Sequence, residues 1–225
     1  MSAPATVVLV HGAWHGAWCW ERVTPLLRAA GHEVITPTLT GLGERAAEAS
    51  SAVNLDTHIA DVAAAVDGLS DPVVVAHSYA GFPAHGAAER VAIGRLVLLD
   101  AFIPRDGETM ADHVGERGEQ YRAAAADDPG WLAPAPPAAV LGVGEGDVEW
   151  VDGAMTPQPV QTYLQPIALT GAAENLDRFY IDCTTPSLAT LDESKRRMAD
   201  VPGAQLACGH DAMIAAAADL AALLL

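Results

Sequence analysis

The chain has 225 residues, about half of them apolar, which is enough for one sizeable core and short for two full domains. Its 29 acidic and 12 basic residues give a net charge of −17, which disfavours nucleic acid and anionic membranes as partners. The three cysteines are odd in number and widely spaced, so we expect neither a disulfide framework nor a zinc site.

Strands and helices alternate along the first hundred residues. Short apolar runs rich in β-branched residues predict buried strands, and apolar residues at helical spacing predict helices. In chain order we expect a strand at Thr6–Val10, a helix at Trp20–Ala30, a strand at Glu33–Thr36, a helix at Leu55–Leu69, a strand at Pro72–Ala76, a helix at Phe82–Val91 and a strand at Arg95–Leu99.

The alternation breaks between about residues 104 and 174, where Pro, Gly, Asp and Glu are frequent. We expect this segment to be an inserted cap of short helices and loops without a clean strand. Alternation resumes with a strand at Arg178–Ile181, a helix at Ser187–Met198, a strand at Ala204–Ala207 and a helix at Ala212–Leu224. The pattern predicts one α/β domain with a doubly wound, mostly parallel sheet of about six strands. Ligands of such sheets bind beyond the carboxyl ends of the strands.

The sequence VVVAHSYAG at residues 73–81 runs from a predicted strand through Ser78 into a predicted helix. A serine on a sharp strand-to-helix turn, with small residues two positions to either side, is typical of a nucleophile elbow. Those neighbours are Ala76 and Ala80, where the commonest pattern has glycine. We predict that Ser78 is a nucleophile, and a solvent-exposed turn serine is the alternative.

His210 stands between the last predicted strand and the last predicted helix. A serine hydroxyl is a poor nucleophile until a base takes its proton, and histidine suits this role because its pKa lies near neutrality. We therefore predict that His210 is the general base.

The sequence HGAWHGAWCW follows the first predicted strand. Acyl transfer needs two preorganised N–H donors for an oxyanion, and we expect them from Ala13 in this loop and from Tyr79 after the nucleophile. His11 and His15 do not share a helix face and have no carboxylate pattern beside them, so we expect no metal site.

The motifs VLVHGAWHGAWCW, AHSYAG and CGHDAM together resemble the α/β-hydrolase group that contains plant methyl-ester esterases and hydroxynitrile lyases. The stretch TPTLTGLGER at residues 36–45 resembles bacterial members of that group. The resemblance covers nearly all of the chain except residues 105 to about 153. It implies a serine hydrolase of carboxylic esters or related acyl compounds that needs no cofactor.

Two aspartates are candidates for the acid that completes a catalytic triad. Most α/β-hydrolases place it after the second-to-last strand, where this chain offers only Asp182 at the strand end. Asp100 ends the strand after the elbow, and adjacent parallel strands are only about 4.8 Å apart. We favour Asp100 over Asp182 and over an acid-free Ser–His pair.

Specificity should lie in the cap and in the loop after the first strand. We expect Trp14, His15, Trp131 and Trp150 to contact the substrate, with ordinary packing as the alternative for the tryptophans. Gly41 and Gly43 lack the rest of a dinucleotide-binding pattern, so we expect no cofactor.

Two other functions share the same site. A lyase or cyclase is one, although cyanohydrin-cleaving relatives have threonine at the position of Gly12 and lysine at that of Asp211. A non-catalytic small-molecule receptor is the other. The chain lacks a recognisable signal peptide and any apolar run of roughly 20 residues, so we expect a cytoplasmic location and no membrane association. The oligomeric state stays open, a homodimer included.

Overall fold

The computed structural model describes residues 4–125 and 131–225. Its main sheet has six parallel strands in the order β2-β1-β3-β4-β7-β8. Their bounds are β1 (Thr6–Val10), β2 (Glu33–Ile35), β3 (Val73–His77), β4 (Arg95–Leu99), β7 (Asp177–Cys183) and β8 (Gly203–Leu206). The doubly wound parallel sheet predicted from the alternating pattern is therefore confirmed.

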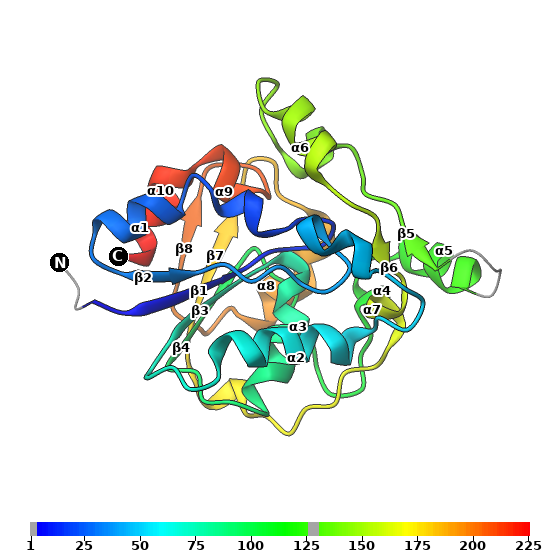
Figure 1. Cartoon of the computed structure of the whole chain (residues 1–225), viewed down its shortest axis with the longest axis horizontal. Helices are drawn as coiled ribbons and strands as arrows, with labels where there is room; N and C mark the ends of the chain where they lie inside the picture. Colours follow the sequence, from blue (N-terminus) through cyan, green and yellow to red (C-terminus); the bar gives the residue numbers. More distant parts are fainter. Residues whose placement is uncertain (1–3, 126–130) are drawn as a thin grey trace.

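Helices cover both faces of this sheet, as Figure 1 shows. On one face lie α2 (Leu55–Val66) and α3 (Gly81–Ala88), and on the other lie α1 (Thr24–Ala29), α9 (Ala212–Ala215) and α10 (Ala217–Leu224). The central strands are apolar on both sides and almost fully buried, as expected for a parallel sheet between two helical layers. Within the described residues, no helix has the length and apolar character that crossing a bilayer requires.

Several helices are shorter than the apolar pattern predicts. The first predicted helix divides into a 3₁₀ turn at Ala17–Trp20 and α1, and the last one breaks between α9 and α10. At that break Ala216 has φ −142° and ψ 42°, outside the helical region. A capping box marks the start of α2, since the side chains of Asn54 and Thr57 each accept a hydrogen bond from the other residue's backbone N–H.

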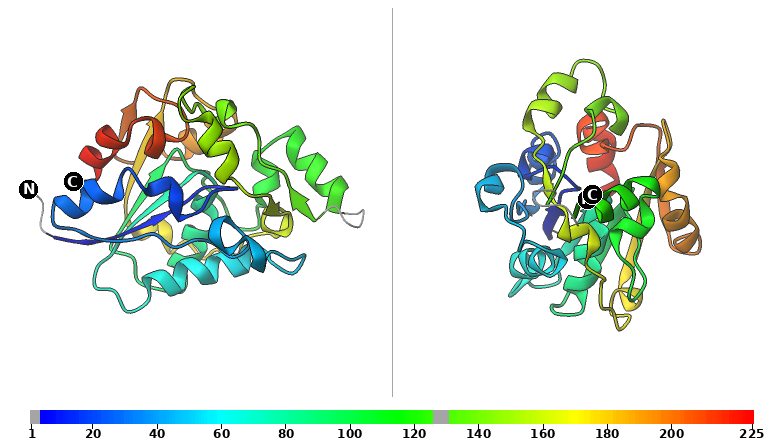
Figure 2. Two further views of the ribbon diagram at one scale, coloured as in Figure 1. Left: turned by 45° about the horizontal axis from the view of Figure 1, so that its top comes forward. Right: turned by 90° about the vertical axis from the view of Figure 1, so that its right-hand side faces the viewer.

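The segment between β4 and β7 consists of short elements. They are α4 (Met110–His113), α5 (Glu116–Ala125), β5 (Leu132–Ala133), α6 (Val148–Ala154), β6 (Gln158–Pro159) and α7 (Gln161–Leu164). β5 and β6 pair in an antiparallel two-residue ladder, so the expectation of no strand in this segment was wrong in this detail. α4, α5, α7 and the β5–β6 pair lie at the end of the molecule opposite the two chain termini, whereas α6 lies at the top of Figure 1 (Figures 1 and 2).

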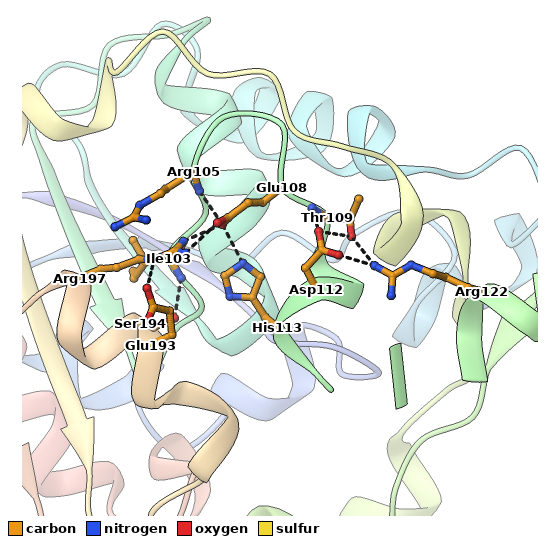
Figure 3. A network of polar contacts seen from close by, with 10 residues as sticks. All are labelled: Ile103, Arg105, Glu108, Thr109, Asp112, His113, Arg122, Glu193, Ser194 and Arg197. Carbon is orange, nitrogen blue, oxygen red and sulfur yellow. Dashed lines mark hydrogen bonds and ion pairs between the residues drawn. The ribbon is translucent and has the colours of Figure 1, made fainter. Parts of the chain in front are cut away.

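A polar network ties the start of this segment to α8 (Asp192–Arg197), as Figure 3 shows. The Glu108 carboxylate accepts two hydrogen bonds from the Arg197 guanidinium, at 2.6 and 2.7 Å, and one from His113 Nε2 at 2.9 Å. Arg197 also donates to the carbonyl of Ile103, and the Ile103 N–H donates to Ser194 Oγ. Burial acts to raise the pKa of Glu108, but the hydrogen bonds from Arg197, the Arg105 N–H and His113 together with the charge of Arg197 outweigh it and lower the pKa to about 2. The network fixes where the inserted segment leaves the sheet.

Candidate active site

Ser78 occupies a strained turn at the carboxyl end of β3. It opens the 3₁₀ turn Ser78–Ala80 with φ 54°, a left-handed conformation that costs energy for a non-glycine residue. The loop after β4 packs tightly on this turn, since the Phe102 N–H donates to the Ser78 carbonyl at 3.0 Å. A Cβ on Gly81 would lie 2.0 Å from the Phe102 carbonyl oxygen. Glycine at that position therefore permits the close approach that holds the turn.

His210 bridges Ser78 and Asp100. Its Nε2 lies 2.8 Å from Ser78 Oγ, and its Nδ1 lies 2.6 Å from Asp100 Oδ2. A carboxylate can only accept a hydrogen bond, so Nδ1 carries the proton and Nε2 presents a lone pair to the serine hydroxyl. Ser78, Asp100 and His210 are at most 7% exposed, so they interact in a low-dielectric setting. This arrangement lets His210 accept the hydroxyl proton of Ser78.

Of the two candidate acids, the structure places Asp100 beside His210. Asp100 is fully buried at the end of β4, and its other carboxylate oxygen accepts from the Cys183 N–H at 3.3 Å. Asp182 lies one strand further along the sheet, with Oδ1 2.6 Å from Lys195 Nζ. Spacing along the chain could not decide which aspartate reaches His210. The direction of each side chain decides it, because Asp100 points to His210 and Asp182 points to Lys195.

Ala13 and Tyr79, the two residues predicted to supply oxyanion donors, both line the pocket next to Ser78. The loop that carries Ala13 approaches the elbow closely. A Cβ on Gly12 would lie 2.8 Å from His77 Nδ1 and 3.0 Å from Ser78 Cβ. A threonine at this position would therefore force the loop or the elbow to move.

A cavity of about 310 Å³ opens over Ser78, at the small end of the usual range for ligand sites. Its walls come from the inserted segment and from the segments that follow β1, β3, β4, β7 and β8. Apart from Ser78 and His210, most lining side chains are apolar. Among the described lining residues, Arg117 is the one with a permanent charge. The apolar walls include Trp14, Phe102, Met110, Val114, Leu141 and Tyr163.

Three residues that we expected to contact the substrate do not line this cavity. His15 is 2% exposed and forms an ion pair with Asp211, with Nε2 3.2 Å from Oδ2. Trp150, on α6, packs edge-on against Trp18, away from the cavity lining. Trp131 precedes β5 and packs against the core. Among the four residues expected to bind substrate, Trp14 lines the cavity.

Several residues that position the catalytic loops were not predicted from the sequence. His77 precedes the nucleophile, and its Nε2 donates to the His210 carbonyl at 3.0 Å, which fixes the loop that carries the base. Gly142 of the inserted segment approaches Gly209 so closely that a Cβ on it would lie 2.5 Å from the Gly209 Cα. The position of His77 inside the elbow was a signal for its role. Nothing in the irregular segment marked Gly142.

Ligand atoms of His77, His210 and Asp211 lie within 4.8 Å of one another, a spacing that a metal ion could use. His210, however, directs both of its ring nitrogens at Ser78 and Asp100. Asp211 is paired with His15. The hydrogen bonds of this cluster fit acid–base chemistry better than metal binding.

Comparisons with known proteins agree with this geometry. Residues 7–223 match the model of the alpha/beta hydrolase family. The carbendazim hydrolyzing esterase of Nocardioides sp. is 38% identical over 93% of this chain and 94% of its own length. Methyl jasmonate esterase 1 of Vitis vinifera is 32% identical, over 53% of this chain and 48% of its own length.

Two solved structures share the fold over nearly the whole chain. An extracellular alpha/beta-hydrolase from a Paenibacillus species aligns with a TM-score of 0.85 and 21% identity, covering 98% of each chain. The methylesterase MES16 from Arabidopsis aligns with a TM-score of 0.76 and 23% identity, covering 98% of this chain and 97% of that one. The chain therefore belongs to the alpha/beta hydrolase family, and it is a carboxylic-ester hydrolase.

Proposed function

We propose that the chain hydrolyses esters through an acyl-enzyme formed on Ser78. The observation that carries this proposal is the chain of two hydrogen bonds from Ser78 Oγ through His210 to Asp100, at 2.8 and 2.6 Å. A serine becomes nucleophilic when such a base takes its proton, and a buried carboxylate stabilises the imidazolium that forms.

The reaction has two halves. Ser78 Oγ attacks the ester carbonyl while His210 Nε2 takes the hydroxyl proton, and the N–H groups of Ala13 and Tyr79 hold the oxyanion. His210 returns the proton to the departing alcohol, which leaves the acyl group on Ser78. Water, activated by His210 in the same way, then releases the carboxylic acid and restores the serine.

The substrate is a small, largely apolar ester. A cavity of about 310 Å³ with mostly apolar walls supports this class. The inserted segment acts as the cap that closes the cavity, since Met110, Val114 and Tyr163 come from it. The names of the relatives add two compounds to test, carbendazim and methyl jasmonate.

A lyase reaction is the second candidate, because the same base and cavity could serve an elimination. Gly12 disfavours cyanohydrin cleavage, because the threonine of cyanohydrin-cleaving relatives is absent and a Cβ at this position would lie only 2.8 Å from His77 Nδ1, closer than van der Waals contact. A receptor without catalysis would need neither the strained Ser78 turn nor its bond to His210.

The test compares kcat of the wild type and Ser78→Ala with p-nitrophenyl esters, methyl jasmonate, carbendazim and mandelonitrile as substrates. We expect kcat on esters to fall by at least about 10³ with the fold intact. The exposed Ser70, on the loop before β3, offers Ser70→Ala as a matched control that keeps wild-type rates. Release of cyanide with esters untouched would favour the lyase, and binding without turnover would favour the receptor.

A further inference from the structure

One peptide group in the oxyanion loop is held from both sides. It is the group between Ala13 and Trp14, directly after the N–H that we assign to the oxyanion hole. Its carbonyl oxygen accepts a hydrogen bond from His15 Nδ1 at 2.7 Å, and its N–H donates to Gln158 Oε1 at 3.1 Å. Together the two contacts fix the orientation of the peptide plane, and with it the backbone of Ala13.

The loop needs such contacts because its backbone is strained. Trp14 has φ 64°, a left-handed conformation that a non-glycine residue adopts only when its surroundings enforce it. The Trp14 carbonyl accepts from the Thr156 N–H at 2.9 Å, and its indole N–H donates to the Ala133 carbonyl at 3.2 Å. The inserted segment therefore contributes to the shape of the loop that carries Ala13.

The orientation of the Gln158 amide follows from its neighbours. Gln158 is fully buried on β6, and its Nε2 lies 2.8 Å from Thr162 Oγ1. The Thr162 hydroxyl uses its own hydrogen to donate to the Pro159 carbonyl at 2.6 Å, so it accepts from the amide. Gln158 Oε1 is thereby directed at the Trp14 N–H.

The contacts of His15 require a doubly protonated ring. Nδ1 faces the Ala13 carbonyl and Nε2 faces the Asp211 carboxylate at 3.2 Å, and both oxygens only accept. Burial acts to lower the pKa of His15, but the charge and hydrogen bond of Asp211 outweigh it and raise the pKa above its ordinary value. Burial acts to raise the pKa of Asp211, but the charge and hydrogen bond of His15 act against it, and the pKa of Asp211 is lowered. His15 is thus a buried imidazolium paired with a carboxylate.

Unlike His15, the neighbouring His11 and His77 have lowered pKa values. His11 donates through Nδ1 to the Gly12 carbonyl and accepts at Nε2 from the Leu39 N–H, so it is neutral, and burial lowers its pKa to about 3. Burial and the nearby His210 hold the pKa of His77 well below its usual value. The titratable groups that interact with the His15–Asp211 pair are His11, Cys19, His77 and His210.

We propose that His15 and Gln158 are positioning residues that clamp the Ala13–Trp14 peptide, with Asp211 as the counterion that keeps His15 protonated. The inference rests on the proposed function, because it assigns the clamp to the oxyanion hole of that reaction. Neither side chain touches the substrate. Each acts through the Ala13 backbone, and their loss lowers kcat because the oxyanion is stabilised only in the transition state.

Two substitutions of His15 separate its two contacts. In His15→Asn the amide nitrogen replaces Nδ1 and keeps the bond to the Ala13 carbonyl, whereas in His15→Gln it replaces Nε2 and reaches Asp211 instead. We expect His15→Gln to lower kcat by about tenfold to a hundredfold with KM nearly unchanged, less than the loss of a whole oxyanion donor. His15→Asn should recover most of that loss. Equal kcat in both variants and the wild type would overturn the proposal.

The pH profile tests the charge of His15. Asp211 raises the folded pKa of His15, so the clamp is complete below that pKa and weakens as the pH rises through it. Asp211→Asn removes the counterion, and the alkaline limb of kcat should move to lower pH. An alkaline limb that stays in place in Asp211→Asn would contradict the role assigned to this pair.

A double-variant cycle tests whether both residues act on the same peptide. Gln158→Met removes the acceptor for the Trp14 N–H at similar volume, and alone it should lower kcat by about tenfold. Combined with His15→Gln, the loss should be smaller than the product of the single losses, because one released peptide cannot be released twice. Strictly multiplicative losses would overturn the clamp.

A control histidine and a labelling experiment complete the design. His32 is buried before β2, where its Nδ1 accepts from the Ala5 N–H at the amino end of the sheet, so His32→Asn should keep kcat within about twofold. Wild-type protein is also treated with a serine-reactive phosphonate. No adduct on the wild type would refute the proposed function itself, whereas an adduct together with unchanged kcat in His15→Gln would refute the clamp alone.

Discussion

Asp100→Asn removes the charge of the acid and leaves its shape almost unchanged. In the structure the two carboxylate oxygens have different partners: Oδ1 accepts from the Cys183 N–H and Oδ2 accepts from His210 Nδ1. An asparagine has only one acceptor oxygen. The Cys183 N–H and the nearby Lys195, with Nζ 4.0 Å from Oδ1, both favour the oxygen on their side. The amide NH₂ then faces His210.

That orientation reverses the histidine tautomer. An NH₂ group donates to Nδ1, so the ring proton moves to Nε2, which faces the Ser78 hydroxyl at 2.8 Å. A protonated Nε2 cannot accept the serine proton. By analogy with triads in which the same change gives the wrong tautomer, we expect kcat to fall by about 10³ to 10⁴. This corresponds to roughly 4 to 5.5 kcal/mol in the activation free energy.

The assay is steady-state hydrolysis of p-nitrophenyl acetate at pH 7.5, with thermal unfolding as the check on folding. Asp182→Asn is the matched control, because Asp182 pairs with Lys195 and should change kcat by less than about threefold. A folded Asp100→Asn protein with more than a tenth of the wild-type kcat would rule out Asp100 as the acid of the triad. A large loss in Asp182→Asn alone would move the role of the acid to that residue.

Three further substitutions test other parts of the site. Gly12→Thr should abolish most ester turnover, measured as kcat/KM, because its Cβ would lie 2.8 Å from His77 Nδ1; wild-type rates would contradict the close approach. Gly81→Ala should lower the free energy of unfolding by about 1–3 kcal/mol or more, measured in urea, since the added Cβ meets the Phe102 carbonyl oxygen at 2.0 Å. Glu108 has a folded pKa of about 2, so it stabilises the fold above its unfolded pKa of about 4.5 and loses this effect as the pH falls toward 2. The urea midpoints of the wild type and Glu108→Gln should therefore differ at pH 6 and approach each other as the pH falls from about 4.5 toward 2, and a constant difference would contradict the shift.

Local patterns were enough to predict the sheet and the places where chemistry-bearing residues end its strands. Buried strands of a parallel sheet read as apolar runs, so the ends of β3 and β4 could be located within one or two residues. Because parallel strands end at the same edge, Ser78, Asp100 and His210 were expected to be neighbours, and the structure brings them together.

Contacts between distant segments could not be predicted in this way. His15 was expected to face the substrate, but its partner Asp211 lies 196 residues away and draws it into the core. The inserted segment has no sustained periodicity, so nothing in its sequence showed that Trp131 and Trp150 pack away from the cavity. Gln158 was missed for the same reason, since its role depends on a backbone N–H 144 residues earlier.

The proposed hydrolysis depends on an acyl group that forms transiently on Ser78. Rapid quenching of the enzyme with p-nitrophenyl acetate, followed by peptide mass spectrometry, tests it most directly. We expect a burst of p-nitrophenol and an acetyl group on the peptide that contains Ser78, and neither of them in Ser78→Ala. Full turnover by Ser78→Ala, or acetylation at another residue that is consumed at the rate of turnover, would contradict it.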